Sequence, residues 1–148
     1  MTASVSTETQ KPAFTLPVRI YFEDTDVGGV VYYANYLKFM ERCRTESLRS
    51  VGIDQSEQLR ESGLAFVVRS VAVEYLKPAR LDDLVEVDMF VEKITRAQIF
   101  FYQRIRRRHA NGWDELARGK IQVVCVQAEE MKLSSIPVAL RQKMESLQ

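Results

Sequence analysis

The sequence predicts an α+β domain in which one long helix packs against an antiparallel sheet of about five strands. One observation is an apolar stripe with a helical period that runs from Tyr36 toward Gly52. A second is the period of two that begins at Leu64 and continues through several runs separated by turn signals. A further strand precedes the helix, and a curved sheet of this size can wrap a single helix. At 148 residues the chain is long enough for one domain with a substantial core.

The N-terminal residues differ in composition from the rest of the chain. Residues 1–16 are polar and rich in threonine, and we expect a flexible tail there, followed by a single domain at 17–148. The tail lacks the apolar region of a signal peptide, and no run reaches the ~18 apolar residues of a membrane span. We therefore expect a cytoplasmic protein without a membrane span.

A strand and an acidic, glycine-bearing loop are predicted before the long helix. Apolar and polar residues alternate from Val18 to Glu23, including Phe22, as in a half-buried strand. Asp24 and Asp26 then interrupt the pattern, and Gly28-Gly29 permits a tight turn. The loop brings Asp26 toward a helix N-terminus, where unpaired N–H groups and the helix dipole favour negative charge. A carboxylate beside such donors is half of an acyl-transfer site, but the same loop also fits a plain turn whose carboxylates bind local N–H groups.

The long helix is predicted to begin between Tyr32 and Asn35 and to end at Gly52, which suits a left-handed C-terminal cap. The apolar residues that recur at helical spacing and should face the core are Tyr36, Phe39, Met40 and Cys43. The charged residues that should face elsewhere are Lys38, Glu41, Arg42, Arg44 and Glu46.

Two shorter helices are also predicted. Asp54 and Glu57 have the spacing of a capping box, and Gly63 would stop the helix that they open. Near the C-terminus, Pro137 suits a first helical turn. The apolar stripe of this last helix would consist of Val138, Leu140 and Met144.

Four strands are expected between Leu64 and residue 127. Residues 66–75 are apolar on nearly both faces, as in a strand that is covered on each side, and Pro78 ends them. In residues 85–92 apolar positions alternate with acidic ones such as Asp88, which predicts one solvent-exposed face. Residues 97–107 form the next strand, and Asn111-Gly112 predicts a hairpin into the last strand at 115–127.

Charge, cysteine and histidine content exclude several classes of function. With 21 basic and 20 acidic residues the net charge is +1, which argues against nucleic acid as the main partner. Cys43 and Cys125 are expected to be buried thiols, and the single histidine, His109, to be an exposed turn residue. A Ser-His or Cys-His catalytic arrangement therefore has no suitable histidine, and no Gly-x-Ser-x-Gly motif occurs. We expect no metal and no cofactor.

Three blocks of the sequence resemble one family. The first runs from Tyr21 to Thr45 and contains YFEDTD, GGVVY and ANY; the second, at 65–83, contains AFVVR and KPARLDD; the third is VCV at 124–126. They closely resemble the signature of hotdog-fold acyl-CoA thioesterases of the 4-hydroxybenzoyl-CoA thioesterase type, and most of all its YbgC, or Tol-Pal-system-associated, branch. The resemblance covers about residues 17–140 and implies the hotdog fold, in which a curved sheet wraps the long helix.

The resemblance implies hydrolysis of an acyl-CoA to a free acid and CoA, so coenzyme A is part of the substrate and not a cofactor. Asp26 matches the family's catalytic aspartate, acting either as a nucleophile or as a base for water. Tyr33 matches the residue whose backbone N–H polarises the thioester carbonyl. Many members of the YbgC branch carry histidine at the position of Tyr33, so a role for an imidazole is lost here. The family also implies a homo-oligomer, a dimer or tetramer, with active sites at the dimer interface.

Contacts to the rest of the substrate are implied less directly. Arg96 matches a position used for nucleotide phosphates in the related enzyme, while Lys93 lies at the same turn and Asn35 lies at the helix start. The run Arg106-Arg107-Arg108 would bind phosphate or an acidic carrier protein, or serve solubility. Two alternative functions stay open: a thioesterase acting on acyl carrier protein, and a non-catalytic scaffold linked to envelope or phospholipid machinery. A hotdog dehydratase would need a catalytic histidine, which the helix region lacks.

Overall fold

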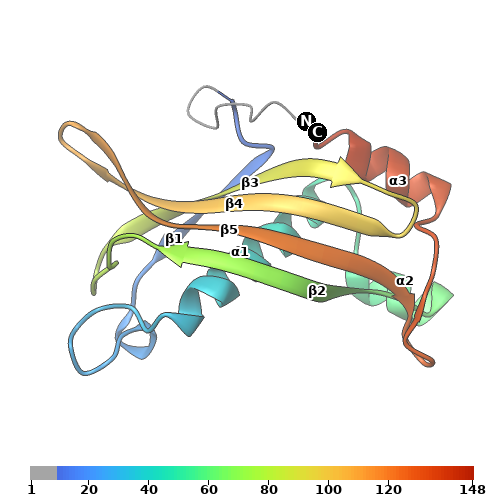
Figure 1. Cartoon of the computed structure of the whole chain (residues 1–148), viewed down its shortest axis with the longest axis horizontal. Helices are drawn as coiled ribbons and strands as arrows, with labels where there is room; N and C mark the ends of the chain where they lie inside the picture. The colour runs from blue at the N-terminus through green and yellow to red at the C-terminus, as the bar shows by residue number, and fades with distance from the viewer. Residues whose placement is uncertain (1–9) are drawn as a thin grey trace.

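The computed structural model describes residues 10–148 as a curved antiparallel sheet with helix α1 (Ala34–Ser50) on one face (Figure 1). Five strands lie in the order β1-β3-β4-β5-β2, and the short β6 pairs with β5. The predicted α+β class and the helix-on-sheet arrangement are confirmed. The strands are β1 (Phe14–Arg19), β2 (Leu64–Tyr75), β3 (Leu84–Ile94), β4 (Gln98–His109), β5 (Gly112–Gln127) and β6 (Lys132–Leu133).

Helix α1 has the predicted limits and the predicted buried face. Gly52 follows it in the left-handed conformation, at φ +84°, where glycine is favoured. The helix packs against β1, β3 and β4. Its buried residues include Tyr36, Phe39, Met40 and Cys43, as expected from the helical spacing. Arg44 is an exception to the prediction that the charged residues face away, because its side chain is partly buried against the sheet.

Strand β1 starts and ends earlier than predicted. It begins at Phe14, whose side chain packs against the core, so the expected tail boundary at residue 16 is too late; residues 1–9 lie outside the described residues. It ends at Arg19. Phe22 lies instead in a short 3₁₀ turn, η1 (Phe22–Asp24), and Phe22 is 80% exposed. Because β1 pairs only with β3, the edge position tolerates Pro17, which cannot donate to a ladder.

The predicted solvent-exposed face of β3 is wrong at Asp88. This residue is fully buried, and its Oδ1 accepts a hydrogen bond of 2.7 Å from Thr15 Oγ1. Its Oδ2 lies 2.6 Å from Arg104 Nε and 2.9 Å from Arg106 Nε. Alternation in a sequence cannot distinguish an exposed carboxylate from one that neighbouring strands pair and bury. Arg106 of the predicted basic run thus joins Arg104, which lies outside that run, in an internal ion-pair network on β4.

Strand β2 is the other edge of the sheet and is not covered on both sides within one chain. It pairs with β5, and its opposite edge has no neighbour among the described strands. Val68, Val71 and Tyr75 are 43–49% exposed. The sequence pattern of a doubly covered strand therefore falls on an exposed edge, which is the position where a second chain can add.

The remaining connections agree with the sequence. The Asp54 side chain accepts a bond of 3.1 Å from Glu57 N at the start of α2 (Gln55–Ser62), and Gly63 ends that helix in the left-handed conformation. The hairpin predicted at Asn111-Gly112 joins β4 to β5. In α3 (Val138–Glu145), Leu140 and Met144 are buried, whereas Val138 is 70% exposed and does not belong to the stripe. None of the helices in residues 10–148 is long and apolar enough to cross a membrane.

Candidate active site

The loop between η1 and α1 is a small hairpin that carries Asp26. Thr25 pairs with Val31, the N–H of Asp26 donates to Val30 O at 3.0 Å, and the N–H of Gly29 donates to Asp26 O at 3.0 Å. Gly29 has φ +77°, a left-handed conformation found in three-residue hairpin loops and disfavoured for side-chain-bearing residues. The second glycine is therefore required by the turn.

The Asp26 carboxylate is exposed and held by one local bond. Its Oδ1 accepts a hydrogen bond of 2.9 Å from Gly28 N, two residues further on. A Cβ atom at position 28 would lie 3.2 Å from the same oxygen, so glycine there leaves space for the carboxylate. Among residues 10–148 no group donates to Oδ2 of Asp26. One oxygen is thus oriented by the turn, and the other is available to a substrate or a water molecule.

Asn35 fastens this loop to the first turn of α1. Its side chain is 8% exposed, and its Nδ2 donates to Asp24 O at 2.9 Å. The same oxygen accepts a second bond, of 3.0 Å, from Tyr32 N. The Asp24 carboxylate in turn accepts from Tyr21 N at 2.8 Å. Asp24 thus stabilises the loop through both its carboxylate and its backbone oxygen. Asn35, which was expected to contact substrate, donates its side-chain N–H to the loop instead.

The backbone N–H of Tyr33 lies at the N-terminus of α1, where helix geometry leaves donors unpaired. In the part of the chain that is described, no acceptor takes this N–H. The Tyr33 ring packs edge-on against Tyr75 at 5.9 Å between centroids, and Tyr75 also contacts Tyr36 at 5.5 Å. Sequence reasoning did not single out Tyr75; the only available signal was its position at the end of a strand rich in apolar residues.

Tyr36 anchors the other side of the loop. It is 4% exposed, as expected for a core residue, and burial raises the pKa of its phenol. Its hydroxyl accepts a bond of 2.9 Å from Ala79 N, and Ala79 O accepts one of 2.8 Å from Val31 N. The segment after β2 therefore clamps the Asp26 hairpin to the start of α1.

Apolar side chains beside Asp26 are exposed within one chain. Val27 is fully exposed, Tyr21 is 61% exposed and Tyr33 is 59% exposed. Exposed apolar clusters of this kind mark binding surfaces. Asp26 and the Tyr33 N–H are therefore surrounded by surface suited to contact with a substrate or another chain.

Arg96 and Lys93 do not lie near Asp26 in one chain. Asp83, at the start of β3, accepts from Ile20 N close to the Asp26 loop, whereas Lys93 and Arg96 lie at the far end of β3. The nine residue-to-residue steps from position 84 to position 93 span ~30 Å of strand. Arg96 donates to Ser135 Oγ at 2.6 Å, and Lys93 lies over the Phe100 ring at 5.6 Å. A site that uses both ends of the sheet needs a second chain.

The other candidate groups have local roles. His109 is exposed, as predicted, but it is the last residue of β4 and lies just before the turn, where its Nδ1 accepts from Asn111 N at 3.1 Å. Arg107 bonds Asp83 at 2.7 Å, and Arg108 lies over the Trp113 ring at 4.6 Å. Burial raises the pKa of Cys43 to about 12 and also raises that of Cys125, so both are inert buried thiols. Within residues 10–148 no group of three or more histidine, cysteine or acidic side chains could hold a metal ion.

A long helix held in a curved antiparallel sheet, with an acidic hairpin at its N-terminus, is the arrangement of a hotdog-fold thioesterase. The chain belongs to the Thioesterase superfamily, whose family pattern matches residues 28–111. The resemblance found from the sequence blocks is confirmed, including the likeness to the YbgC branch and to 4-hydroxybenzoyl-CoA thioesterase.

Individual relatives support this assignment. The chain is 44% identical to the acyl-CoA thioesterase YbgC of Haemophilus influenzae, over 84% of this chain and 88% of that protein. It is 42% identical to the acyl-CoA thioester hydrolase YbgC of Escherichia coli, over 86% of this chain and 92% of that protein. A 4-hydroxybenzoyl-CoA thioesterase mutant complexed with 4-hydroxybenzoyl-CoA shares the fold, with a TM-score of 0.80 at 19% identity, over 87% of this chain and 96% of that one.

Proposed function

We propose that this chain hydrolyses acyl-CoA thioesters to a free acid and CoA, with Asp26 as the reacting carboxylate and the Tyr33 N–H as the donor to the thioester oxygen. The observation that carries the proposal is the hairpin at the N-terminus of α1, which holds one carboxylate oxygen of Asp26 and leaves the other free. The names of the YbgC relatives support the same reaction and the same carrier.

The reaction needs little more than these two groups. The thioester carbonyl oxygen gains negative charge when its carbon is attacked, and an unpaired N–H at a helix N-terminus stabilises that charge. Asp26 either attacks the carbon itself, giving an anhydride that water then cleaves, or removes a proton from an attacking water molecule. In both routes the C–S bond breaks, the thiolate of CoA leaves and takes up a proton, and the acyl group departs as a carboxylic acid.

A second copy of the chain completes the proposed site. Asp26 is exposed in one chain, and water around a carboxylate weakens it as a base or nucleophile. Exposed apolar residues beside Asp26, such as Val27, and along β2, such as Val71, support association along this side of the molecule. A homodimer, alone or as half of a tetramer, would also bring the distant Arg96 and Lys93 of one chain toward the Asp26 loop of the other.

The reaction is tested by measuring thiol release from short, long and aromatic acyl-CoAs and from the same acyl groups on acyl carrier protein. We expect at least one acyl-CoA to turn over with a higher kcat/KM than its carrier-protein thioester. Turnover on the carrier protein alone would replace the proposed substrate. Absence of turnover on both would favour the scaffold function, and cell fractionation separately tests the expected cytoplasmic location.

The shared site is tested by mixing two impaired variants, Asp26→Asn and Arg96→Ala. In a mixed dimer, one site combines the intact Asp26 of one chain with the intact Arg96 of the other. We expect activity to reappear on mixing and to approach about a quarter of the wild-type value, because half of randomly mixed dimers are mixed and each has one intact site. Mixing without any gain, with exchange of subunits verified, would show that the two residues do not serve one site.

A further inference from the structure

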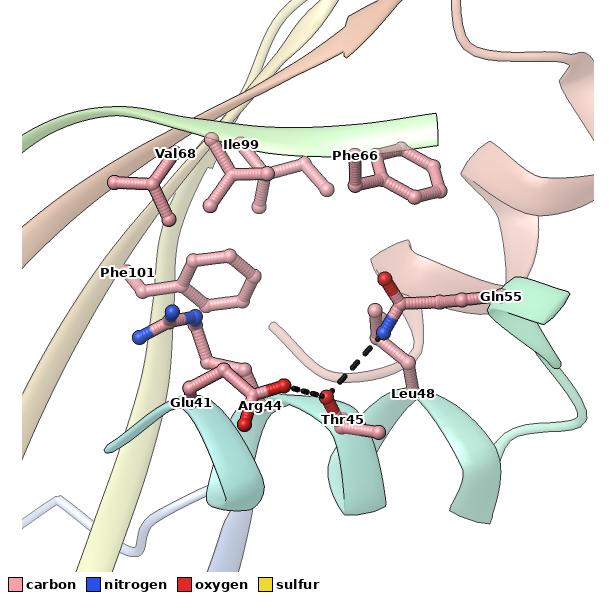
Figure 2. A pocket seen from close by; sticks show the side chains of 10 residues that line it. Glu41, Arg44, Thr45, Leu48, Gln55, Phe66, Val68, Ile99 and Phe101 are labelled. Carbon is pink, nitrogen blue, oxygen red and sulfur yellow. Dashed lines mark hydrogen bonds between the residues drawn. The ribbon is translucent and has the colours of Figure 1, made fainter. Parts of the chain in front are cut away.

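A cavity of about 100 Å³ lies between α1 and the inner face of the sheet, well separated from the Asp26 loop. Figure 2 shows its apolar side, formed by strand residues that include Phe66, Ile99 and Phe101, and its helix side, which carries Arg44 and Thr45. Gln55 of α2 closes one end, and its Nε2 lies 3.4 Å from Thr45 Oγ1. The cavity is thus apolar on its sheet side, whereas its helix side is polar and carries Glu41 as well as Arg44.

Among residues 10–148, the hydrogen bond that the Arg44 side chain makes goes to a neutral partner. Its Nη1 donates to Gln103 Oε1 at 2.9 Å. Gln103 is fully buried and is fixed in this orientation because its Nε2 donates to Met40 O at 3.0 Å. Within residues 10–148 no carboxylate lies within salt-bridge distance of the Arg44 guanidinium. The Glu41 carboxylate also lines the cavity, and its charge partly opposes the lowering of the Arg44 pKa by burial, but the hydrogen bond that it accepts comes from Thr45 Oγ1, at 2.9 Å.

This arrangement leaves hydrogen-bonding capacity at the cavity wall. A guanidinium has five N–H donors and stays charged in proteins, and Gln103 uses one of them. Burial lowers the pKa of Arg44, which reflects the cost of holding its charge away from water. An acceptor oxygen that enters the cavity would offset that cost by accepting from the unused N–H donors of Arg44.

Helix α1 and strand β2 border both the cavity and the proposed reaction site at Tyr33. Arg44 follows Tyr33 by eleven residues (44 minus 33), which is close to three full turns, so both lie on one face of α1, ~16 Å apart. Strand β2 runs alongside in the opposite direction, with Tyr75 against Tyr33 and Phe66 at the cavity. An extended chain of about a dozen carbon atoms bridges that distance.

We propose that Arg44 binds an oxygen atom near the far end of the acyl group, so that the enzyme selects medium-length acyl-CoAs that carry a terminal hydroxyl or carboxylate. This inference rests on the proposed function and adds a substrate class to it. Phe101 and Ile99 would pack against the last methylenes of such a chain. Arg44 would donate hydrogen bonds to the terminal oxygen in place of the water that this oxygen loses on entering the cavity.

The test compares kcat/KM for three thioesters of one chain length, about twelve carbons: the plain acyl-CoA, its ω-hydroxy form and its ω-carboxy form. We expect the wild type to prefer at least one oxygenated form by about tenfold or more, as for a hydrogen bond to a charged group. In Arg44→Met, which keeps the length of the stem, the ratio of oxygenated to plain substrate should fall to about one. Arg44→Lys should retain part of the ratio, because it keeps the charge and loses the planar fork.

Arg42→Met is the matched control, since Arg42 is an exposed arginine on the same helix and lies outside the cavity. It should keep the wild-type ratio. A wild type that prefers the plain acyl-CoA, or an Arg44→Met variant with an unchanged ratio, would overturn the inference while leaving the thioesterase function intact. If Arg44→Met instead dissociates the oligomer in sedimentation and lowers the rate on all three substrates equally, Arg44 pairs with another chain and the inference also fails. Failure of the wild type on every acyl-CoA would refute the proposed function itself.

Discussion

The contact between Gly28 and the Asp26 carboxylate allows the geometry of the reacting group to be disturbed without disturbing the fold. A Cβ atom at position 28 would lie 3.2 Å from Asp26 Oδ1, closer than an ordinary contact of 3.4–4 Å. Gly28 does not have a positive φ, so alanine fits its backbone without strain. The Asp26 oxygen must therefore move by a few tenths of an ångström in Gly28→Ala.

A misplacement of ~1 Å costs about 10²-fold in rate, so a shift of a few tenths should lower kcat by about three- to tenfold. Stability should be unchanged or higher by about 0.4–1 kcal/mol, because alanine restricts the unfolded chain more than glycine does. The matched variant is Gly29→Ala, where a Cβ meets nothing within 4 Å but φ is +77°. It should lose about 1–2 kcal/mol of stability and keep kcat within about threefold.

Thiol release from one acyl-CoA measures kcat, and urea unfolding measures the free energy of unfolding for both variants. We expect opposite patterns: a loss of rate without a loss of stability at position 28, and a loss of stability without a large loss of rate at position 29. If Gly28→Ala is as active as the wild type, the hydrogen bond between the loop and the Asp26 carboxylate does not position the reacting group, and the reasoning is refuted.

Three further predictions concern the core. Asp88→Asn should lower the free energy of unfolding in urea by about 3–5 kcal/mol, because it removes the buried carboxylate that pairs with Arg104 and Arg106; a loss below about 1 kcal/mol would contradict this. Tyr36→Phe should cost about 1–3 kcal/mol by leaving the Ala79 N–H without its acceptor, and an unchanged urea midpoint would refute it. The folded pKa of Cys43, about 12, exceeds its ordinary value of 9.0, so its contribution to stability is complete below pH 9 and is lost as pH rises toward 12. Urea midpoints should therefore fall less between about pH 8 and pH 10.5 in Cys43→Ala than in the wild type, and equal slopes would contradict the assignment.

The parts of the fold that were predictable are those specified by local sequence. The limits of α1 followed from apolar spacing and from Gly52, and the Asp26 turn followed from its two glycines. The capping of α2 by Asp54 needs only residues three apart in sequence. Such features depend on neighbouring residues, and a single sequence contains them.

The parts that failed depend on contacts between distant segments. Asp88 has the pattern of an exposed strand residue, and only its pairing with Arg104 and Thr15 buries it. Arg44 was assigned to the outer face of α1, although it follows the buried Met40 by four residues and so shares part of its face. Its partner Gln103 is a polar residue in an otherwise apolar row of β4. These two positions together were the sequence signal for a buried polar pair.

The separation of candidate site residues along the sheet was also beyond the sequence. Family resemblance placed Arg96 and Asp26 in one site, but resemblance carries no distances. The strand register puts them near opposite ends of β3, so a site that contains both residues would need two chains.

The most direct test of the proposed role of Asp26 is a comparison of Asp26→Asn with Asp24→Asn on the best acyl-CoA, after both are shown to form the wild-type oligomer. We expect Asp26→Asn to lower kcat/KM by at least ~10²-fold, or ~2.7 kcal/mol of transition-state stabilisation, because its reacting oxygen is lost. Asp24→Asn should have a smaller effect, since its side chain accepts a bond from Tyr21 N and an amide oxygen can still do so. An Asp26→Asn variant as active as the wild type would contradict the account, and Asp26 would then be only a residue of the turn.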